Sequence, residues 1–87
     1  MRLDKFLKVS RLIKRRPLAK QIADQGRIKL NGNIAKASTN VNVDDELEIR
    51  YGQRRLTVKI RTLKEHVKKE EATELYQILK EEKISEE

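Results

Sequence analysis

The spacing of apolar residues changes at Gly26, and this change constrains the fold more than any other feature of the chain. Before Gly26, apolar side chains recur at helical spacing over residues 3–9 and again over residues 17–25. After it, over residues 27–30, they alternate with polar ones, which is typical of a half-buried strand. We therefore expect an α+β domain in which two short helices precede a small sheet.

The second helix has recognisable signals at both ends. Pro17 suits its first turn, where the missing N–H costs nothing, and Gly26 suits the left-handed residue that commonly follows a helix. The basic segment 11–16 joins the two helices. The expected apolar faces consist of Leu3, Phe6 and Leu7 in the first helix and of Leu18, Ala19, Ile22 and Ala23 in the second.

Hairpin signals follow in the second half of the chain. Asn31-Gly32-Asn33 predicts a tight turn, because Asn and Gly accept positive φ, and a strand returns from Ile34. Residues 47–51 and 56–60 alternate in the same way and are joined by residues 52–55. The fold class we expect is two N-terminal helices packed on a small, mostly antiparallel sheet.

A C-terminal helix completes the expected fold. Five apolar side chains between residues 70 and 82 share one face at helical spacing, which predicts a helix there. We expect the polar residues 81–87 beyond it to form a frayed acidic tail. The five side chains are Ala72, Leu75, Tyr76, Ile78 and Leu79.

Positive charge is concentrated at the start of the chain. The 87 residues carry a net charge of +7, and residues 1–20 alone, with eight basic groups and Asp4, account for a charge of +7. Residues 63–87 sum to −3, with five basic and eight acidic groups. A one-sided block of this kind favours an anionic partner over a merely solvated surface.

Several classes of protein are disfavoured. The chain has no cysteine, which argues against disulfide scaffolds and suits a reducing cytoplasm, and no apolar run is long enough to span a membrane. His66, the only histidine, has no neighbouring partner of the kind catalysis needs, and we expect it at the surface. The acidic corner 44–46 is expected to be a solvated loop and not a metal site. We expect no enzyme, cofactor or metal.

The scarcity of aromatic residues narrows the class of nucleic acid that this chain is expected to bind. Single-strand binders stack bases on exposed rings, but aromatics are 3% of this chain, and Phe6 and Tyr76 fall on expected core faces. Only Tyr51 is left as a stacking platform. Arginines in the link favour bidentate phosphate contacts. These features favour a structured RNA read through its backbone and shape, while a helix-turn-helix DNA regulator stays an alternative.

The order of particular residues resembles the S-four-type RNA-binding domain, named after ribosomal small-subunit protein four. The resemblance covers about residues 1–60, and one departure is Asp44, where the pattern usually has Gly. Asp tolerates unusual turn geometry, so we question the turn type there and not the fold. The matching residues are Arg2-Leu3-Asp4-Lys5-Phe6-Leu7, Arg11, Arg16, Ala19, Ile22, Gly26, Ile28-Lys29-Leu30-Asn31-Gly32, Lys36, Ser38, Val41, Val43 and Asp45.

The resemblance implies a function and a division of the chain. Residues 1–62 would be the RNA-binding domain, and residues 63–87 the C-terminal helix and tail of the same compact unit. A freestanding chain of this length is most similar to the RqcP family and to the small heat-shock-induced ribosome-binding proteins. Members of such a family bind large-subunit rRNA and tRNA on subunits obstructed by peptidyl-tRNA, while a partner tailing factor adds C-terminal alanines. A cytoplasmic location is implied, with no membrane partner.

The resemblance implies roles for individual residues of this chain. We expect Asp4 to orient a neighbouring basic side chain or to cap the helix. Asn31 and Lys36 are possible RNA contacts, with a turn former and strand surface as the structural alternatives, and Lys8 and Lys14 are weaker candidates. The expected phosphate contacts are Arg2, Lys5, Arg11, Arg15, Arg16 and Lys20.

Two other functions stay open at this point. The chain could be an accessory subunit that lends RNA affinity to an RNA-modifying enzyme, because domains of this type also occur attached to such enzymes. It could also be a small DNA-binding regulator, although the second helix exposes few basic groups.

Overall fold

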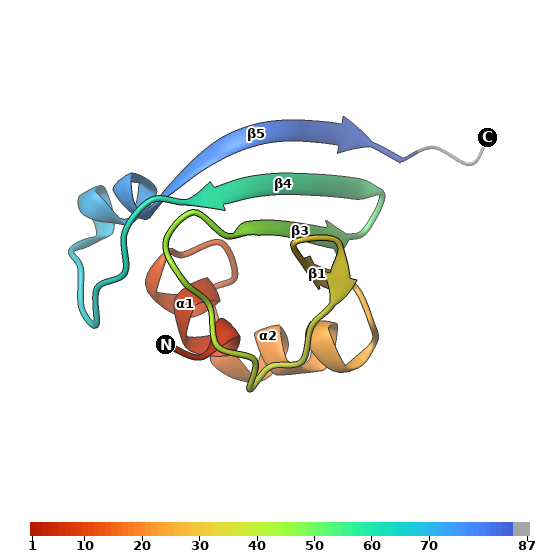
Figure 1. The fold of residues 1–87 in the computed structure, drawn as a ribbon, viewed down its shortest axis with the longest axis horizontal. Coiled ribbons are helices and arrows are strands. Elements are labelled where there is room, and N and C mark those ends of the chain that lie inside the picture. The colour runs from red at the N-terminus through yellow and green to blue at the C-terminus, as the bar shows by residue number, and fades with distance from the viewer. Residues whose placement is uncertain (85–87) are drawn as a thin grey trace.

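Two helices lie on one side of a five-stranded antiparallel sheet in the computed structural model, which describes residues 1–84 (Figure 1). The strand order is β2-β1-β3-β4-β5. The expected α+β class is confirmed. The elements are α1 (Leu3–Val9), α2 (Arg16–Asp24), β1 (Ile28–Leu30), β2 (Asn33–Ile34), β3 (Glu46–Tyr51), β4 (Arg54–Ile60), the 3-10 helix η1 (Lys69–Leu75) and β5 (Tyr76–Lys83).

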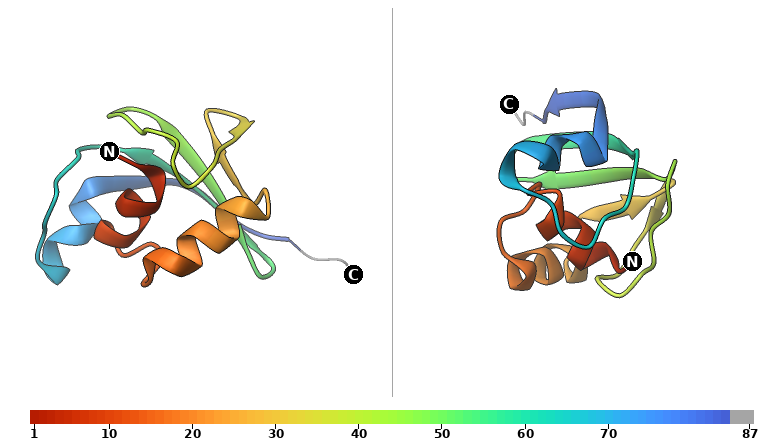
Figure 2. Two further views of the ribbon diagram at one scale, coloured as in Figure 1. Left: turned by 90° about the horizontal axis from the view of Figure 1, so that it is seen from below. Right: turned by 90° about the vertical axis from the view of Figure 1, so that its left-hand side faces the viewer.

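The two helices form where their end signals place them. Pro17 lies in the first turn of α2, and Gly26 follows the helix with φ of 75°, in the left-handed region that glycine accepts. Residues of both apolar faces enter the core, with one exception. Leu18, in the first turn of α2, was expected among them but is 45% exposed. Figure 2 shows the two helices side by side beneath the sheet.

The core lies between these helices and the inner face of the sheet. Alternate residues of β3 and β4 are buried. In the register of these two strands, Leu47 lies opposite Val58 and Ile49 lies opposite Leu56. Burial of the apolar surface of each pair stabilises the fold by roughly 25 cal/mol for each Å² removed from water. Phe6 of α1 packs into the same cluster and is fully buried, so it is unavailable for stacking a base.

Two turns use the left-handed conformation. Asn31 and Gly32 have φ of 52° and 90° and join β1 to β2 as a two-residue hairpin loop. Asp44, the departure from the family pattern, has φ of 76°. The aspartate therefore adopts the conformation that a glycine would take, and the chain geometry before β3 is retained.

The C-terminal segment corrects the expectation of a helix over residues 70–82. Only η1 is helical, as a 3-10 helix, and from Tyr76 the chain is extended and pairs with β4. Strand pairing satisfies the outer backbone groups of β4, which a helix would leave unpaired. Of the five apolar residues expected on one face, Ala72 and Leu75 are buried, whereas Ile78 and Leu79 are exposed.

The expected frayed tail is also partly corrected. Glu81, Glu82 and Lys83 are paired in β5 opposite Leu56, Arg55 and Arg54. The amide of Ile84 donates to the carbonyl of Gln53 at 2.6 Å, and residues 85–87 of that tail lie outside the described residues. Within residues 1–84, no helix has the length and apolar character needed to cross a membrane.

Candidate nucleic-acid interface

A buried carboxylate holds two arginines at the junction of the two helices. Asp4 is in the first turn of α1, and its side chain is only 6% exposed. Arg2 donates from Nε to Asp4 Oδ1 at 3.2 Å and from Nη2 to Oδ2 at 3.4 Å. Arg16, at the start of α2, lies with Nε 3.2 Å from Oδ2 and donates from Nη2 to Oδ1 at 3.4 Å. We call Arg2, Asp4 and Arg16 the Asp4 cluster.

The Asp4 cluster remains positively charged. Burial alone would raise the pKa of Asp4, but the hydrogen bonds from Arg16 and Arg2, with their charges, outweigh it and hold that pKa below its ordinary value. The carboxylate is therefore ionised at neutral pH and cancels one of the two guanidinium charges. The arginine side chains are 50% and 43% exposed, so donors not used by Asp4 can face a phosphate.

The backbone around Asp4 is fixed by a distant loop. The amides of Leu3 and Asp4 donate to the carbonyls of Thr39 and Ala37 at 2.7 and 3.1 Å. Arg2 forms an isolated antiparallel bridge with Asn40. These bonds use amides that the start of a helix normally leaves unpaired. Asp4 is thus placed to orient both arginines, and no side chain caps α1.

The basic link between the helices is also rigid. Ser10 is buried, donates from Oγ to the carbonyl of Leu7 at 3.3 Å, and accepts from the amide of Leu12 at 3.4 Å. Ile13 is buried in the core cluster. Arg11 has φ of 62°, a conformation that is uncommon for a residue with a side chain. Anchored on both sides, the link presents Arg11, Lys14 and Arg15 to solvent.

Lys5 and Lys20, the remaining expected phosphate contacts, differ in their surroundings. Lys5 is partly exposed and forms a hydrogen-bonded ion pair with Glu65, far along the chain. That hydrogen bond lowers the pKa of Glu65. Lys20 of α2 is exposed, as is the weaker candidate Lys8 of α1.

Asn31 and Lys36 lie in different places: Asn31 is in the β1–β2 turn, whereas Lys36 is in the loop after β2, next to Ala37, whose carbonyl accepts from the amide of Asp4. Asn31 donates from Nδ2 to Asp45 Oδ1 at 3.1 Å and accepts at Oδ1 from the amide of Glu46 at 2.9 Å. Its side chain therefore fastens the β1–β2 turn to the start of β3, as a turn former would. Lys36 has an exposed side chain, and its amide donates to Thr39 Oγ1 at 2.9 Å.

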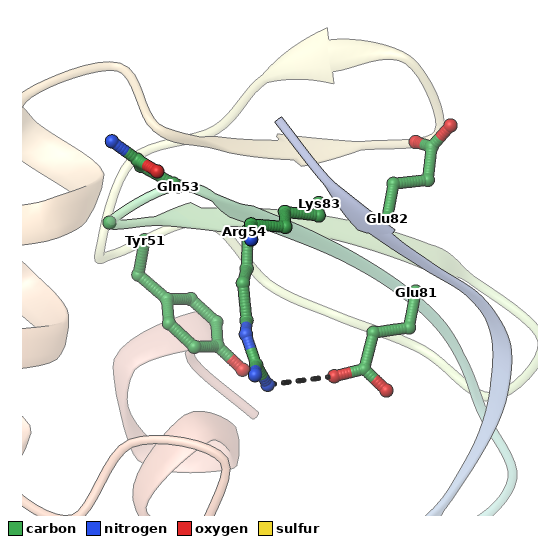
Figure 3. Close-up of a pocket in the computed structure, with 7 residues that line it drawn as sticks. Tyr51, Gln53, Arg54, Glu81, Glu82 and Lys83 are labelled. Atoms are coloured by element: carbon green, nitrogen blue, oxygen red, sulfur yellow. Dashed lines mark hydrogen bonds and ion pairs between the residues drawn. The ribbon is translucent and has the colours of Figure 1, made fainter. Parts of the chain in front are cut away.

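Tyr51, the expected stacking platform, lines an open hollow of about 770 Å³ at the β3–β4 hairpin (Figure 3). Burial, followed by the negative charge of Glu81, raises the pKa of Tyr51. In Figure 3 the hydroxyl end of the ring points toward the Arg54 guanidinium, which pairs with Glu81 at 3.4 Å. Glu82 and Lys83 also line this hollow. The mixed charges attract phosphate less than the Asp4 cluster does.

Metal-binding geometry is absent from the part of the chain that the structure covers. No group of three or more His, Cys, Asp or Glu side chains there could hold a metal ion. The acidic corner is instead part of the loop hydrogen bonding, with Asp45 accepting from the amide of Asn42 at 2.8 Å.

Known proteins resemble this chain in sequence and fold. Residues 1–47 match the family model described as S4 domain. The chain is 65% identical over 86 residues to the RQC P-site tRNA stabilizing factor of Bacillus subtilis (strain 168), covering 99% of this chain and 100% of that protein. The factor of the same name from Halalkalibacterium halodurans is 65% identical over 85 residues, which are 98% of this chain and 97% of that one.

A solved structure agrees with the fold over most of the chain. The structure described as trimeric Vibrio cholerae Heat Shock Protein 15 superposes with a TM-score of 0.83 at 32% sequence identity. The match covers 90% of this chain and 80% of that one. It extends well beyond the residues that match the S4 domain model, and therefore includes part of the C-terminal segment.

Proposed function

Since the chain belongs to the S4 domain family, and within it to the RQC P-site tRNA stabilizing factors, we propose that it is a noncatalytic RNA-binding factor of ribosome-associated quality control. It binds large-subunit rRNA and tRNA on subunits obstructed by peptidyl-tRNA. The Asp4 cluster is the observation that carries this proposal. Its two arginines are held in one place and still carry a net positive charge.

Binding by this surface is a matter of phosphate neutralisation. Each phosphate met by a Lys or Arg releases condensed counterions, so affinity depends steeply on salt. Arg2 and Arg16 supply fixed forks that match phosphate oxygens in two places. The other expected contacts from the link and α2 are exposed and extend the same basic region; they are Arg11, Arg15 and Lys20.

The factor acts by holding tRNA in place and leaves chemistry to others. Its proposed partners are large-subunit rRNA, the peptidyl-tRNA and a tailing factor that adds C-terminal alanines. The proposed location is the cytoplasm, where ribosomes work. A preorganised surface suits this role, because no ordering of the arginines is needed when RNA arrives.

Salt-dependent binding to large subunits tests the proposal. Purified wild-type chain and the variant Arg2→Ala plus Arg16→Ala are titrated onto large subunits carrying peptidyl-tRNA. We expect the double variant to bind at least about tenfold more weakly and to lose about two from the slope of log affinity against log salt. The matched control, Arg54→Ala plus Arg61→Ala, removes two exposed arginines, at the start of β4 and just past its end, that are not part of the Asp4 cluster.

Two results would refute the assignment. The first is a wild-type affinity that barely changes with salt, because phosphate contacts require a steep dependence. The second is equal loss of binding in the control variant, which would show that total charge matters and the Asp4 cluster does not.

A further inference from the structure

A basic hollow separate from the Asp4 cluster lies at the end of α1. It is a groove of about 560 Å³ between the end of α1, the basic link and the segment that connects β4 to η1. That segment passes beside α1 in both figures (Figures 1 and 2). We call this hollow the link groove. Its lining consists of Lys8, Val9, Arg11, Lys14, Glu65, His66, Val67 and Lys69.

The lining of the link groove is strongly cationic. Four of its side chains are Lys or Arg, and a histidine stands beside them. Its one acid, Glu65, is already paired with Lys5, which is not part of the lining. The negative charge is therefore balanced from outside, and a concave wall of one sign concentrates the field for an anion.

The walls of the link groove are set before any ligand arrives. Val9 and Val67 both pack against the core cluster, so each side of the groove is anchored on the same core. Arg11 is held with positive φ between buried Ser10 and buried Ile13. A strained backbone that persists between anchors is a pointer to function.

The link groove and the Asp4 cluster use different residues. Neither Arg2 nor Arg16 lines the groove, and His66 and Lys69 lie outside residues 1–47 that match the S4 domain model. The groove is therefore built partly by the domain and partly by the chain that follows it.

We propose that the link groove binds the phosphate backbone of a second stretch of RNA, with Lys69 and His66 acting together with Lys8, Arg11 and Lys14. The proposal rests on the proposed function, because it takes RNA as the partner. Phosphates fit better than bases, since no Phe, Tyr or Trp side chain lines the groove and long cationic side chains reach a backbone from several angles. Contact at both surfaces would let one small chain bridge two RNA segments.

Paired charge-removal variants test the groove. Wild type, Lys14→Gln plus Lys69→Gln, and a control, Lys80→Gln plus Lys83→Gln, are titrated with an unmodified tRNA transcript at several salt concentrations. All four lysines are exposed, and both variants lose two charges. We expect the groove variant to bind roughly tenfold more weakly with a salt slope lower by about two, and the control to match wild type.

Amide chemical shifts add a readout that does not depend on affinity. When the tRNA is added to labelled wild-type chain, the amides of His66, Val67 and Lys69 should shift. Absence of these shifts, or equal affinity of the groove and control variants, would overturn the proposal that the link groove binds RNA.

The two proposals fail in different ways. If Arg2→Ala plus Arg16→Ala weakens binding while the groove variant does not, the groove is wrong and the proposed function stands. If wild type binds neither tRNA nor large subunits, both are wrong.

Discussion

The Asp4 cluster and the pairing of β4 with β5 contain the same chemical groups with different consequences. In the cluster, a nearly buried carboxylate lies between two arginines at 3.2 Å. Across the strands, Glu82 pairs with Arg55 at 2.9 Å and Glu81 with Arg54 at 3.4 Å. The shortest of these contacts is therefore not in the candidate interface. What distinguishes the cluster is burial of the acid, which turns a surface ion pair into a fixed support.

The largest expected effect is on stability at Asp4. Asp4→Asn keeps the shape of the side chain but removes its charge, so the hydrogen bonds from both arginines weaken. We expect the free energy of unfolding to fall by about 2 kcal/mol, measured by urea denaturation at neutral pH. An unchanged denaturation midpoint would contradict the view of Asp4 as a support.

Lowering the pH should remove the stability difference between wild type and Asp4→Asn. The pKa of Asp4 is lowered in the folded state, so its stabilising contribution is complete above the ordinary value of 3.8 and is lost as pH falls below that value through the folded pKa. We expect the stability gap between wild type and Asp4→Asn to close over this range. Denaturation measured at a series of pH values checks it, and a gap that widens in acid would contradict the sign.

RNA affinity should fall in Asp4→Asn, although the change in net charge alone predicts that it rises. The variant gains one unit of positive charge, which alone would strengthen binding. We expect it to bind large subunits about fivefold more weakly, because Arg2 and Arg16 lose their fixed orientation and must be ordered on binding. Tighter binding than wild type would show that charge outweighs orientation here.

The smallest expected effect belongs to the strand pair. The hydrogen bond from Arg55 lowers the pKa of Glu82, yet both side chains are partly exposed and salt screens the contact. We expect Glu82→Gln to leave both urea stability and RNA affinity unchanged. A loss comparable to that of Asp4→Asn would erase the distinction between the two regions.

Much of the N-terminal architecture could be predicted from sequence, because its signals are local. Pro17, Gly26 and the Asn31-Gly32 turn each act on their immediate neighbours, and the structure places each where the sequence indicated. The C-terminal segment was harder because its short apolar run suits both a helix and a strand. The outcome was decided by the open edge of β4, which is not visible in residues 70–82 alone.

The candidate site was predictable as a set of charges and less so as an arrangement. The basic block identified Arg2 and Arg16 as candidates, but their meeting at Asp4 depends on how α1 packs against α2. The pairing of Lys5 with Glu65 joins residues 60 positions apart. His66 was expected at the surface and is exposed, but its place beside Lys69 in the link groove was not predicted, because the negative net charge of residues 63–87 hides a local group of cationic side chains.

The outer edge of β5 has a consequence for the solubility of the chain. This strand ends the sheet, and its far side meets no other strand within residues 1–84. Such an edge is a template on which further strands can add. Four consecutive charged residues, Lys80 to Lys83, occupy half of the strand, and a strand arriving there would have to strip water from them. The same stretch that made the helix prediction fail therefore protects concentrated protein against edge-to-edge aggregation.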